Sequence, residues 1–209
     1  MSKMWQVWVL VFCVAVGSCA FAQDKDKDKG KDKDKDRKET EVERESKKEV
    51  EVNEVLTGSI SHLRRLVLPM IMAMPEEKYG FAPTNGEFKG VRTFGQQVKH
   101  MAATNFVYAS AILGEKPPVD GGEDQDGPAS VKTKDEIQKY LLDSFAYVLK
   151  AVDTIDEKNV TGPINNPFGQ GTTTRLAMST LIIGHCYDHY GQMVEYLRMN
   201  GIVPPASQH

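Results

Sequence analysis

The sequence predicts an all-α protein, a four-helix bundle with crossover connections that occupies residues 52–205. Three observations predict this fold. Four stretches repeat apolar residues at the spacing of an α-helix, and no stretch alternates apolar and polar residues for long enough to require a sheet. Two connections between these stretches are long, which is typical of bundles whose chain crosses from one end to the other. We expect a signal peptide and a disordered charged tether before the bundle, and a short C-terminal tail, residues 206–209, after it.

Residues 1–22 have the features of a signal peptide. Lys3 makes the start positive, an apolar run covers residues 7–16, and Ala20-Phe21-Ala22 fits the small-x-small cleavage pattern. We therefore expect cleavage after residue 22 and export to the periplasm or the extracellular space. The apolar run is short for a bilayer, so we expect no stable membrane span after cleavage. The alternative is a lipid anchor on Cys19, because the four residues ending there weakly resemble a lipoprotein box without its usual leucine.

Residues 23–51 are expected to form a charged, low-complexity linker. From Asp24 to Glu51, nine Lys and two Arg stand against six Asp and six Glu, so the net charge is 11 − 12 = −1. Such a stretch cannot bury enough apolar surface to offset its ordering entropy, and we expect a solvated spacer. An arm that binds nucleic acid carries one sign of charge, and the whole chain has a net charge of only −3, so we expect no nucleic-acid partner.

The first two helices are predicted over about residues 53–74 and 93–113. Pro75 should end the first helix, because proline has no backbone donor and clashes with the preceding turn, or it marks the first turn of a new element. Gly114 should end the second. The apolar stripes consist of Val55, Ile60, Leu63, Leu66, Val67, Met70 and Ile71 in the first helix, and of Phe94, Val98, Met101, Phe106, Val107 and Ile112 in the second.

The third and fourth helices are predicted over about residues 134–153 and 173–200. Thr133 is a good N-cap, and Glu136 stands three residues later, which is the capping-box arrangement. Gly201 should close the fourth helix.

The connections over residues 114–130 and 156–171 are both long. The first is rich in Gly, Asp and Pro. We expect it to run along the length of the bundle, which would make the second and third helices parallel neighbours and not a hairpin.

A pair of histidines in the fourth helix is the strongest chemical feature of the sequence. His185 and His189 are four residues apart, so they lie one turn apart on the same face and their imidazoles can bind one ion. Leu181, Gln192 and Tyr196 continue this face, which we therefore expect to point into the bundle. The alternative for such a pair is two surface or core-capping histidines.

A third ligand is expected from His100 in the second helix. Gln97 and Thr104 share its face one turn away and can hydrogen-bond to ligands. Three neutral imidazoles leave coordination positions open for water or substrate, as in catalytic metal sites. We expect His62 to be a partly exposed helix residue. Cys186, the one cysteine left after cleavage at residue 22, should pack as a small apolar side chain and cannot form an internal disulfide.

Three separated motifs carry a resemblance to a known family. Residues 185–205 resemble the last helix of the DinB/YfiT-like family, and so do residues 74–81 and residues 92–96, which precede the helix with His100. The resemblance covers roughly residues 52–205. It implies a four-helix bundle with crossovers and a divalent metal, commonly zinc or nickel, on one histidine of the second helix and two of the fourth, here His100, His185 and His189. Family members often form homodimers, and some are thiol-dependent transferases.

The functional hypothesis is an exported metalloenzyme. A divalent metal, zinc or nickel, would activate water or a thiol toward an electrophilic small-molecule substrate, as in a hydrolase or a thiol transferase. Gln97, Asp188, Gln192 and Tyr196 are the candidates for contacting the ligands or the substrate. The alternative is a non-catalytic, metal-stabilised binding or scaffold domain of the cell envelope, and a third option is metal sequestration.

Overall fold

The structure is a computed structural model that describes residues 49–208. The expected signal peptide, the alternative anchor at Cys19 and nearly all of the expected charged linker lie outside the described residues. Within the described range, no helix combines the length and the apolar character that crossing a membrane requires.

Four long α-helices dominate the described part of the chain. They are α2 (Val52–Ala73), α3 (Phe94–Leu113), α4 (Lys134–Asp153) and α5 (Arg175–Met199). Short 3₁₀ turns lie at Glu76–Lys78, Glu123–Gln125 and Pro205–Ser207. The predicted four-helix bundle is confirmed, and each helix begins and ends within two residues of its predicted bounds.

Side-chain chemistry sets the helix ends, and the capping box predicted at Thr133 is confirmed. Thr93 and Thr133 each accept a hydrogen bond from the backbone N–H three residues later, and the side chains of Gln96 and Glu136 bond back to complete two capping boxes. Gly114 ends α3 with φ 71°, in the left-handed region that glycine adopts without strain. These caps place the ends of α3 and α4, and α3 carries half of the site described below.

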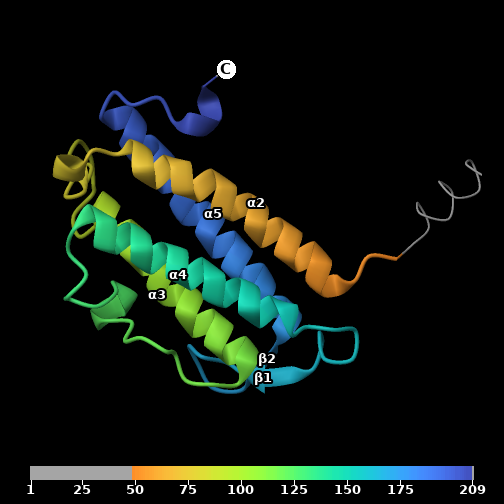
Figure 1. Cartoon of the computed structure of the whole chain (residues 1–209). Helices are drawn as coiled ribbons and strands as arrows, with labels where there is room; N and C mark the ends of the chain where they lie inside the picture. Colours follow the sequence, from red (N-terminus) through yellow and green to blue (C-terminus); the bar gives the residue numbers. More distant parts are fainter. Residues whose placement is uncertain (1–48, 209) are drawn as a thin grey trace, which may run out of the picture. The chain divides into compact units, whose positions relative to one another are not determined.

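Helices α3 and α4 are parallel neighbours (Figure 1). Their hydrogen bonds advance together along both helices, from Asn105–Ser144 to Ser110–Tyr147. Residues 114–133 must therefore carry the chain back along the bundle, which confirms the expected crossover.

The second long connection does not cross. It holds an antiparallel hairpin of β1 (Pro163–Asn165) and β2 (Thr172–Thr174), with Ile164 opposite Thr173. Strands of three residues are too short for period-two alternation to be recognised, which is why the sequence did not predict them. After the hairpin, α5 starts at the end of the bundle where α4 stops and runs antiparallel to α3 (Figure 1).

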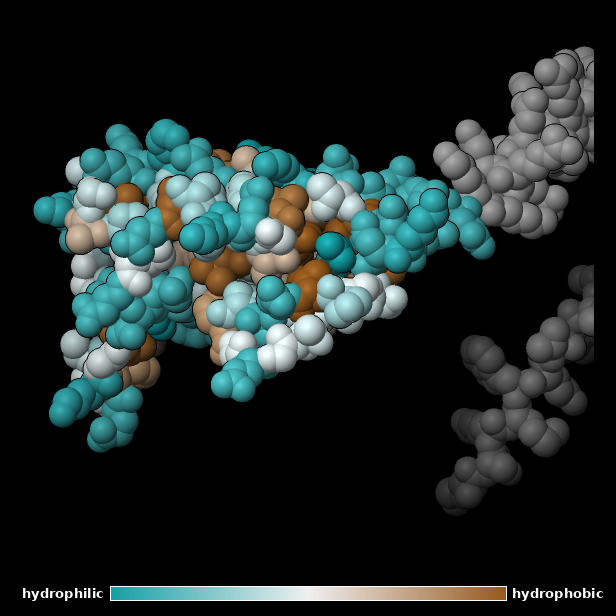
Figure 2. All heavy atoms as spheres, turned by 90° about the horizontal axis from the view of Figure 1, so that it is seen from below, coloured by the Kyte–Doolittle hydropathy of each residue, from teal (hydrophilic) through white to brown (hydrophobic). Residues whose placement is uncertain are grey.

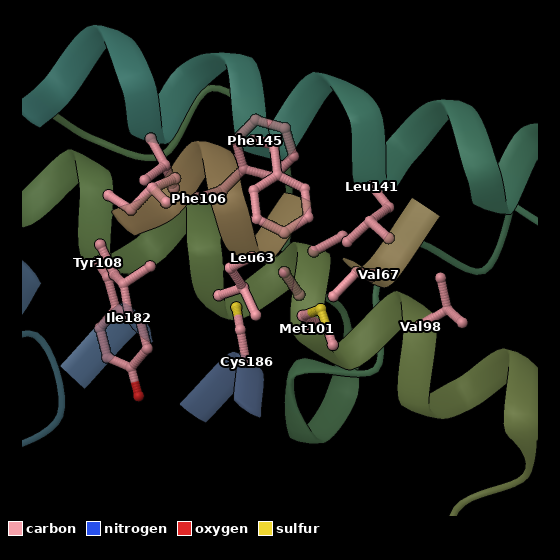
Figure 3. Close-up of a cluster of buried hydrophobic side chains, with 14 of the residues drawn as sticks. Leu63, Val67, Val98, Met101, Phe106, Tyr108, Leu141, Phe145, Ile182 and Cys186 are labelled. Atoms are coloured by element: carbon pink, nitrogen blue, oxygen red, sulfur yellow. The ribbon is translucent and has the colours of Figure 1, made fainter. Parts of the chain in front are cut away.

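The core is formed by the inner faces of all four helices (Figure 3). Its largest fully buried side chains include Ile60, Leu63, Phe94, Met101, Leu141, Phe145 and Ile182. Burying a side chain of this size stabilises the fold by about 1.5–3 kcal/mol, so the core fixes the relative positions of α3 and α5. Three residues of the predicted apolar stripes lie outside the buried core. Val55 is 54 % exposed, with Leu56 in the buried position beside it, and Leu66 and Val107 are only partly buried.

A buried polar contact joins three helices inside this core. The Asn105 amide donates to Ser144 Oγ on α4 at 3.2 Å and accepts the Cys186 S–H from α5 at 3.3 Å. Cys186 is fully buried, and burial raises its pKa to about 12, so it stays a neutral thiol. This agrees with the expectation of a small packing residue.

The outer surface of the bundle is mainly hydrophilic. The face shown in Figure 2 also carries hydrophobic residues, which gather in its central part. Large side chains that remain exposed include Phe168 and Leu181.

Candidate metal centre

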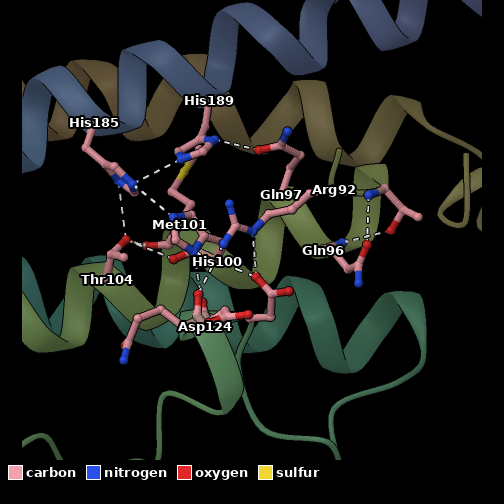
Figure 4. Close-up of polar contacts among 12 residues, drawn as sticks. Arg92, Gln96, Gln97, His100, Met101, Thr104, Asp124, His185 and His189 are labelled. Carbon is pink, nitrogen blue, oxygen red and sulfur yellow. Dashed lines mark hydrogen bonds and ion pairs between the residues drawn. The ribbon is translucent and has the colours of Figure 1, made fainter. Parts of the chain in front are cut away.

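Three histidines from α3 and α5 converge at one point inside the bundle (Figure 4). The Nε2 atom of His185 lies 3.3 Å from Nε2 of His100 and 3.0 Å from Nε2 of His189. All three ligand atoms lie within 4.8 Å of one another. The antiparallel packing of α3 on α5 brings these residues together although about 85 positions separate them in the sequence.

Each of the three rings uses its other nitrogen, Nδ1, for a hydrogen bond to the protein. The partners are the carbonyl of Gln125 for His100 at 3.0 Å, the hydroxyl of Thr104 for His185 at 3.3 Å, and Oε1 of Gln97 for His189 at 2.5 Å.

These partners fix the tautomer of all three imidazoles. A backbone carbonyl and an amide oxygen can only accept, so Nδ1 of His100 and of His189 must carry the proton. The Thr104 hydroxyl donates to the carbonyl of His100 at 2.8 Å, which leaves its oxygen to accept from His185. All three Nε2 atoms can therefore present lone pairs to their common centre, which is compatible with the binding of one metal ion.

The hydrogen-bond network continues from His189 to the surface. Gln97 Nε2 donates to Gln192 Oε1 at 2.8 Å, and Gln192 Nε2 donates to the exposed carboxylate of Asp188 at 2.9 Å. Every donor in this series faces toward Asp188. The series therefore couples the buried ring of His189 to a negative charge without burying that charge.

A tight loop, residues 121–127, supplies the partner of His100. A hydrogen bond of 2.7 Å closes it between its first and last residues. Asp124 and Gln125 have φ of 50° and 59°, a region that residues other than glycine seldom adopt. A Cβ on Gly122 would lie 2.2 Å from the carbonyl oxygen of the last loop residue, so only glycine fits there. This conformation directs the Gln125 carbonyl at the ring of His100.

Arg92 holds the same loop from the other side. Its Nε donates to Asp126 at 2.6 Å, and its Nη2 donates to the carbonyl of Asp124 at 3.1 Å. Tyr196 donates in turn to the Arg92 carbonyl at 3.0 Å. Tyr196 was predicted to contact the ligands or the substrate, and the structure places its hydroxyl on this supporting backbone.

Burial keeps the three rings neutral. It lowers the pKa of His185 to about 3 and that of His189 to about 4, and it lowers the pKa of His100 as well. The other rings of the cluster lower the pKa of His185 and His189 further, and the positive charge of Arg92 acts on all three in the same direction. Neutral imidazole is the form that binds a metal ion.

The geometry of the cluster fits a divalent ion. Bonds of about 2.0–2.1 Å with tetrahedral angles place two ligand nitrogens about 3.3 Å apart, and smaller angles bring them closer. The two Nε2 separations in the cluster, 3.3 and 3.0 Å, agree with such a site. Three ligands would leave at least one position free.

A polar hollow of about 680 Å³ opens beside the cluster. Its lining includes Arg92, Gln96, His100, Asp124, Asp126, Asp188, His189 and Gln192. Because His100 and His189 are part of this lining, the hollow borders the cluster.

The remaining residues of the predicted site take different places. His62 is exposed, as expected. Leu181, which was expected on the inward face of α5, is 47 % exposed. Each step of four residues turns a helix by about 40° beyond a full circle, so Leu181 lies about 80° away from the direction of His189 and leaves the interface with α3. That part of the prediction is wrong.

The fold and the site together define a class: a four-helix bundle with three inward-facing histidines that are compatible with one metal ion. The sequence model of the DinB superfamily matches residues 59–193, more than half of the chain. The protein belongs to this superfamily.

Two solved structures show the same fold. A DinB-like protein from Bacillus cereus ATCC 10987 has a TM-score of 0.61 at 18 % identity, covering 74 % of this chain and 96 % of that one. A conserved protein from Enterococcus faecalis has a TM-score of 0.58 at 16 % identity, covering 72 % of this chain and 98 % of that one. No curated protein matches the chain.

Proposed function

We propose that this protein is a metal-dependent enzyme that holds one divalent ion, zinc or nickel, on Nε2 of His100, His185 and His189. One observation carries the proposal: all three Nδ1 atoms have protein hydrogen-bond partners, and all three Nε2 atoms face one common centre. Without a cation, the Nε2 lone pair of His185 would be repelled by those of His100 and His189, at 3.3 and 3.0 Å, in a partly buried site.

The residues around the cluster support a catalytic site more than a closed structural one. A bound divalent ion lowers the pKa of water or a thiol and so makes either a nucleophile at neutral pH. The polar hollow gives access to the cluster, and Arg92 and Gln192 offer N–H donors along its wall for a polar substrate. The reaction class is attack by water or a thiol on an electrophilic small molecule, as in a hydrolase or a thiol transferase.

We also propose that the protein acts outside the cytoplasm. This rests on the positive start, apolar run and cleavage motif within residues 1–22. N-terminal sequencing of the protein recovered from the producing cell tests it: a mature chain beginning at Gln23 agrees, and an intact Met1 contradicts it.

The metal content of the purified chain tests the main proposal. We expect about one zinc or nickel ion per chain, loss of the ion in His189→Ala, and an unchanged content in the control His62→Ala, because His62 is exposed and outside the cluster. A panel of hydrolase and thiol-transfer substrates should then show turnover that a chelator abolishes and the metal restores. Stoichiometric metal without any chelator-sensitive turnover would favour the scaffold alternative, and a chain that binds no divalent ion would refute both.

A further inference from the structure

A second hollow lies beside the histidine cluster and has a different chemistry. Its volume is about 810 Å³, and its lining comes from the C-terminal half of α3, residues 114–117, the hairpin and the first residue of α5. Its apolar lining consists of Val107, Ala111, Pro163, Ile164, Pro167 and Phe168. We refer to it as the hairpin hollow.

Arg175 lines the hairpin hollow, and its guanidinium forms no ion pair with any of the described residues. Among residues 49–208, no carboxylate lies within ion-pair distance of Arg175, and its guanidinium makes one hydrogen bond there, a long contact of 3.4 Å to the Asn159 carbonyl. Arg175 is partly buried and is the first residue of α5, where the helix dipole adds to the positive potential.

The other charges of the hairpin hollow do not cancel this one. Glu115 already accepts from Tyr147 and lies 3.8 Å from Lys150. Lys116 forms no ion pair within the described part of the chain. The hairpin hollow is therefore electropositive. The polar hollow is electronegative, because three carboxylates and only one cationic side chain, Arg92, line it.

An exposed aromatic ring stands at the same place. Phe168 is 51 % exposed and packs edge-on against Tyr108, with ring centroids 5.3 Å apart. Leaving a phenyl ring half exposed is unfavourable, and an apolar ligand in the hollow would cover it.

Two residues connect the hairpin hollow to the histidines. Tyr108 contacts Phe168 on one side and His185 on the other, at a centroid distance of 5.9 Å. Gln125 is part of the lining of the hollow, and its backbone carbonyl accepts a hydrogen bond from Nδ1 of His100. A ligand in the hollow is thus separated from the cluster by a single layer of residues.

We propose that the hairpin hollow binds a small amphiphilic anion, with its carboxylate, sulfonate or phosphate on Arg175 and its apolar body against Phe168 and Ile164. The site does not rest on the proposed enzymatic function, because Tyr108 and Gln125 lie between the hollow and the histidine cluster. The binding itself depends on the protein alone and not on the metal.

Fluorescence titration with anilinonaphthalene sulfonate tests the site in chelator-treated protein. We expect one molecule bound per chain and about tenfold weaker binding to Arg175→Gln, because an ionic hydrogen bond is lost. The uncharged analogue phenylnaphthylamine should bind both proteins equally. Arg198→Gln is the matched control, since Arg198 is also on α5 but pairs with Glu195.

A second variant tests the apolar wall and guards against a folding defect. Phe168→Ala should weaken binding of both the charged and the uncharged probe, and thermal melting of each variant shows whether the fold is retained. The proposal is overturned if Arg175→Gln binds the sulfonate as tightly as the parent chain, or if Phe168→Ala changes neither affinity. A chain that binds the sulfonate in an Arg175-dependent manner but holds no metal would support this site and refute the metalloenzyme separately.

Discussion

Replacing Gln97 by leucine tests whether hydrogen bonds behind the histidines set the affinity of the proposed metal site. Gln97 is 2 % exposed, and its amide links His189 to Gln192 through bonds of 2.5 and 2.8 Å. Leucine has a similar size and keeps the packing, but it leaves Nδ1 of His189 without an acceptor. The change therefore removes the orienting bond and leaves the ligand itself in place.

The magnitude follows from this geometry. Loss of a hydrogen bond to a ligating histidine lowers metal affinity by about 10–100-fold, which corresponds to about 1.4–2.7 kcal/mol. The upper part of this range is expected here, because the Nδ1–H is buried and no other acceptor is bonded to it. Gln97→Glu retains an acceptor and adds negative charge, so its affinity should equal or exceed that of the parent chain.

Competition with a chromophoric zinc chelator at neutral pH measures these affinities. The matched control is Gln138→Leu on α4, which also loses one side-chain hydrogen bond, to Tyr79, but lies outside the histidine cluster. It should lower thermal stability slightly and leave the metal affinity unchanged. A folded Gln97→Leu protein that binds zinc as tightly as the parent chain would show that the reasoning is wrong.

Three further predictions follow from the same structure. Metal-free protein should lose thermal stability as the pH falls from 7 to 5, because His185 and His189 have folded pKa values near 3 and 4 while the unfolded rings take up protons at about 6.5; a melting temperature that does not change over this range would contradict it. Cys186 should resist a thiol reagent at pH 8 until the protein is denatured, as followed by absorbance, and rapid labelling of the native chain would show that the thiol is accessible. Gly122→Ala should lower metal affinity, because its Cβ would meet a carbonyl oxygen at 2.2 Å, whereas Gly201→Ala, with similar φ and no neighbour within 4 Å, should affect stability alone.

The fold and the histidines were accessible from the sequence because both leave periodic signals. Apolar spacing marked all four helices, and capping residues marked their ends. A spacing of four residues placed His185 and His189 on one face, and Gln97 lay within one turn of His100. The sequence did not indicate which histidine each hydrogen-bonding residue contacts. Gln97 accepts from His189 on α5 and not from His100, its neighbour on α3. This pairing depends on the offset between two helices that contact across the core.

The loop over residues 121–127 could not be predicted in the same way. The loop contributes a backbone carbonyl to the cluster, that of Gln125. Because every residue type has a backbone carbonyl, the residue type at this position does not indicate the contact. The sequence signal for this loop is an acidic segment with glycines at both ends. Such a segment indicates a tight turn, but it does not indicate which residue the turn contacts. Arg92 lies two residues before α3 begins, and its role likewise becomes visible only when Asp126 is placed beside it.

The topology explains why one connection contributes to both hollows. Because α3 and α4 are parallel, residues 114–133 must return along the whole length of α3. The start of this segment, at Glu115 and Lys116, forms one wall of the hairpin hollow, and its middle, at Gln125 and Asp126, reaches the ring of His100. An up-and-down bundle would join the same helices by a short turn and would leave His100 without this partner. The crossover therefore supplies to the candidate site an acceptor that the helices do not provide.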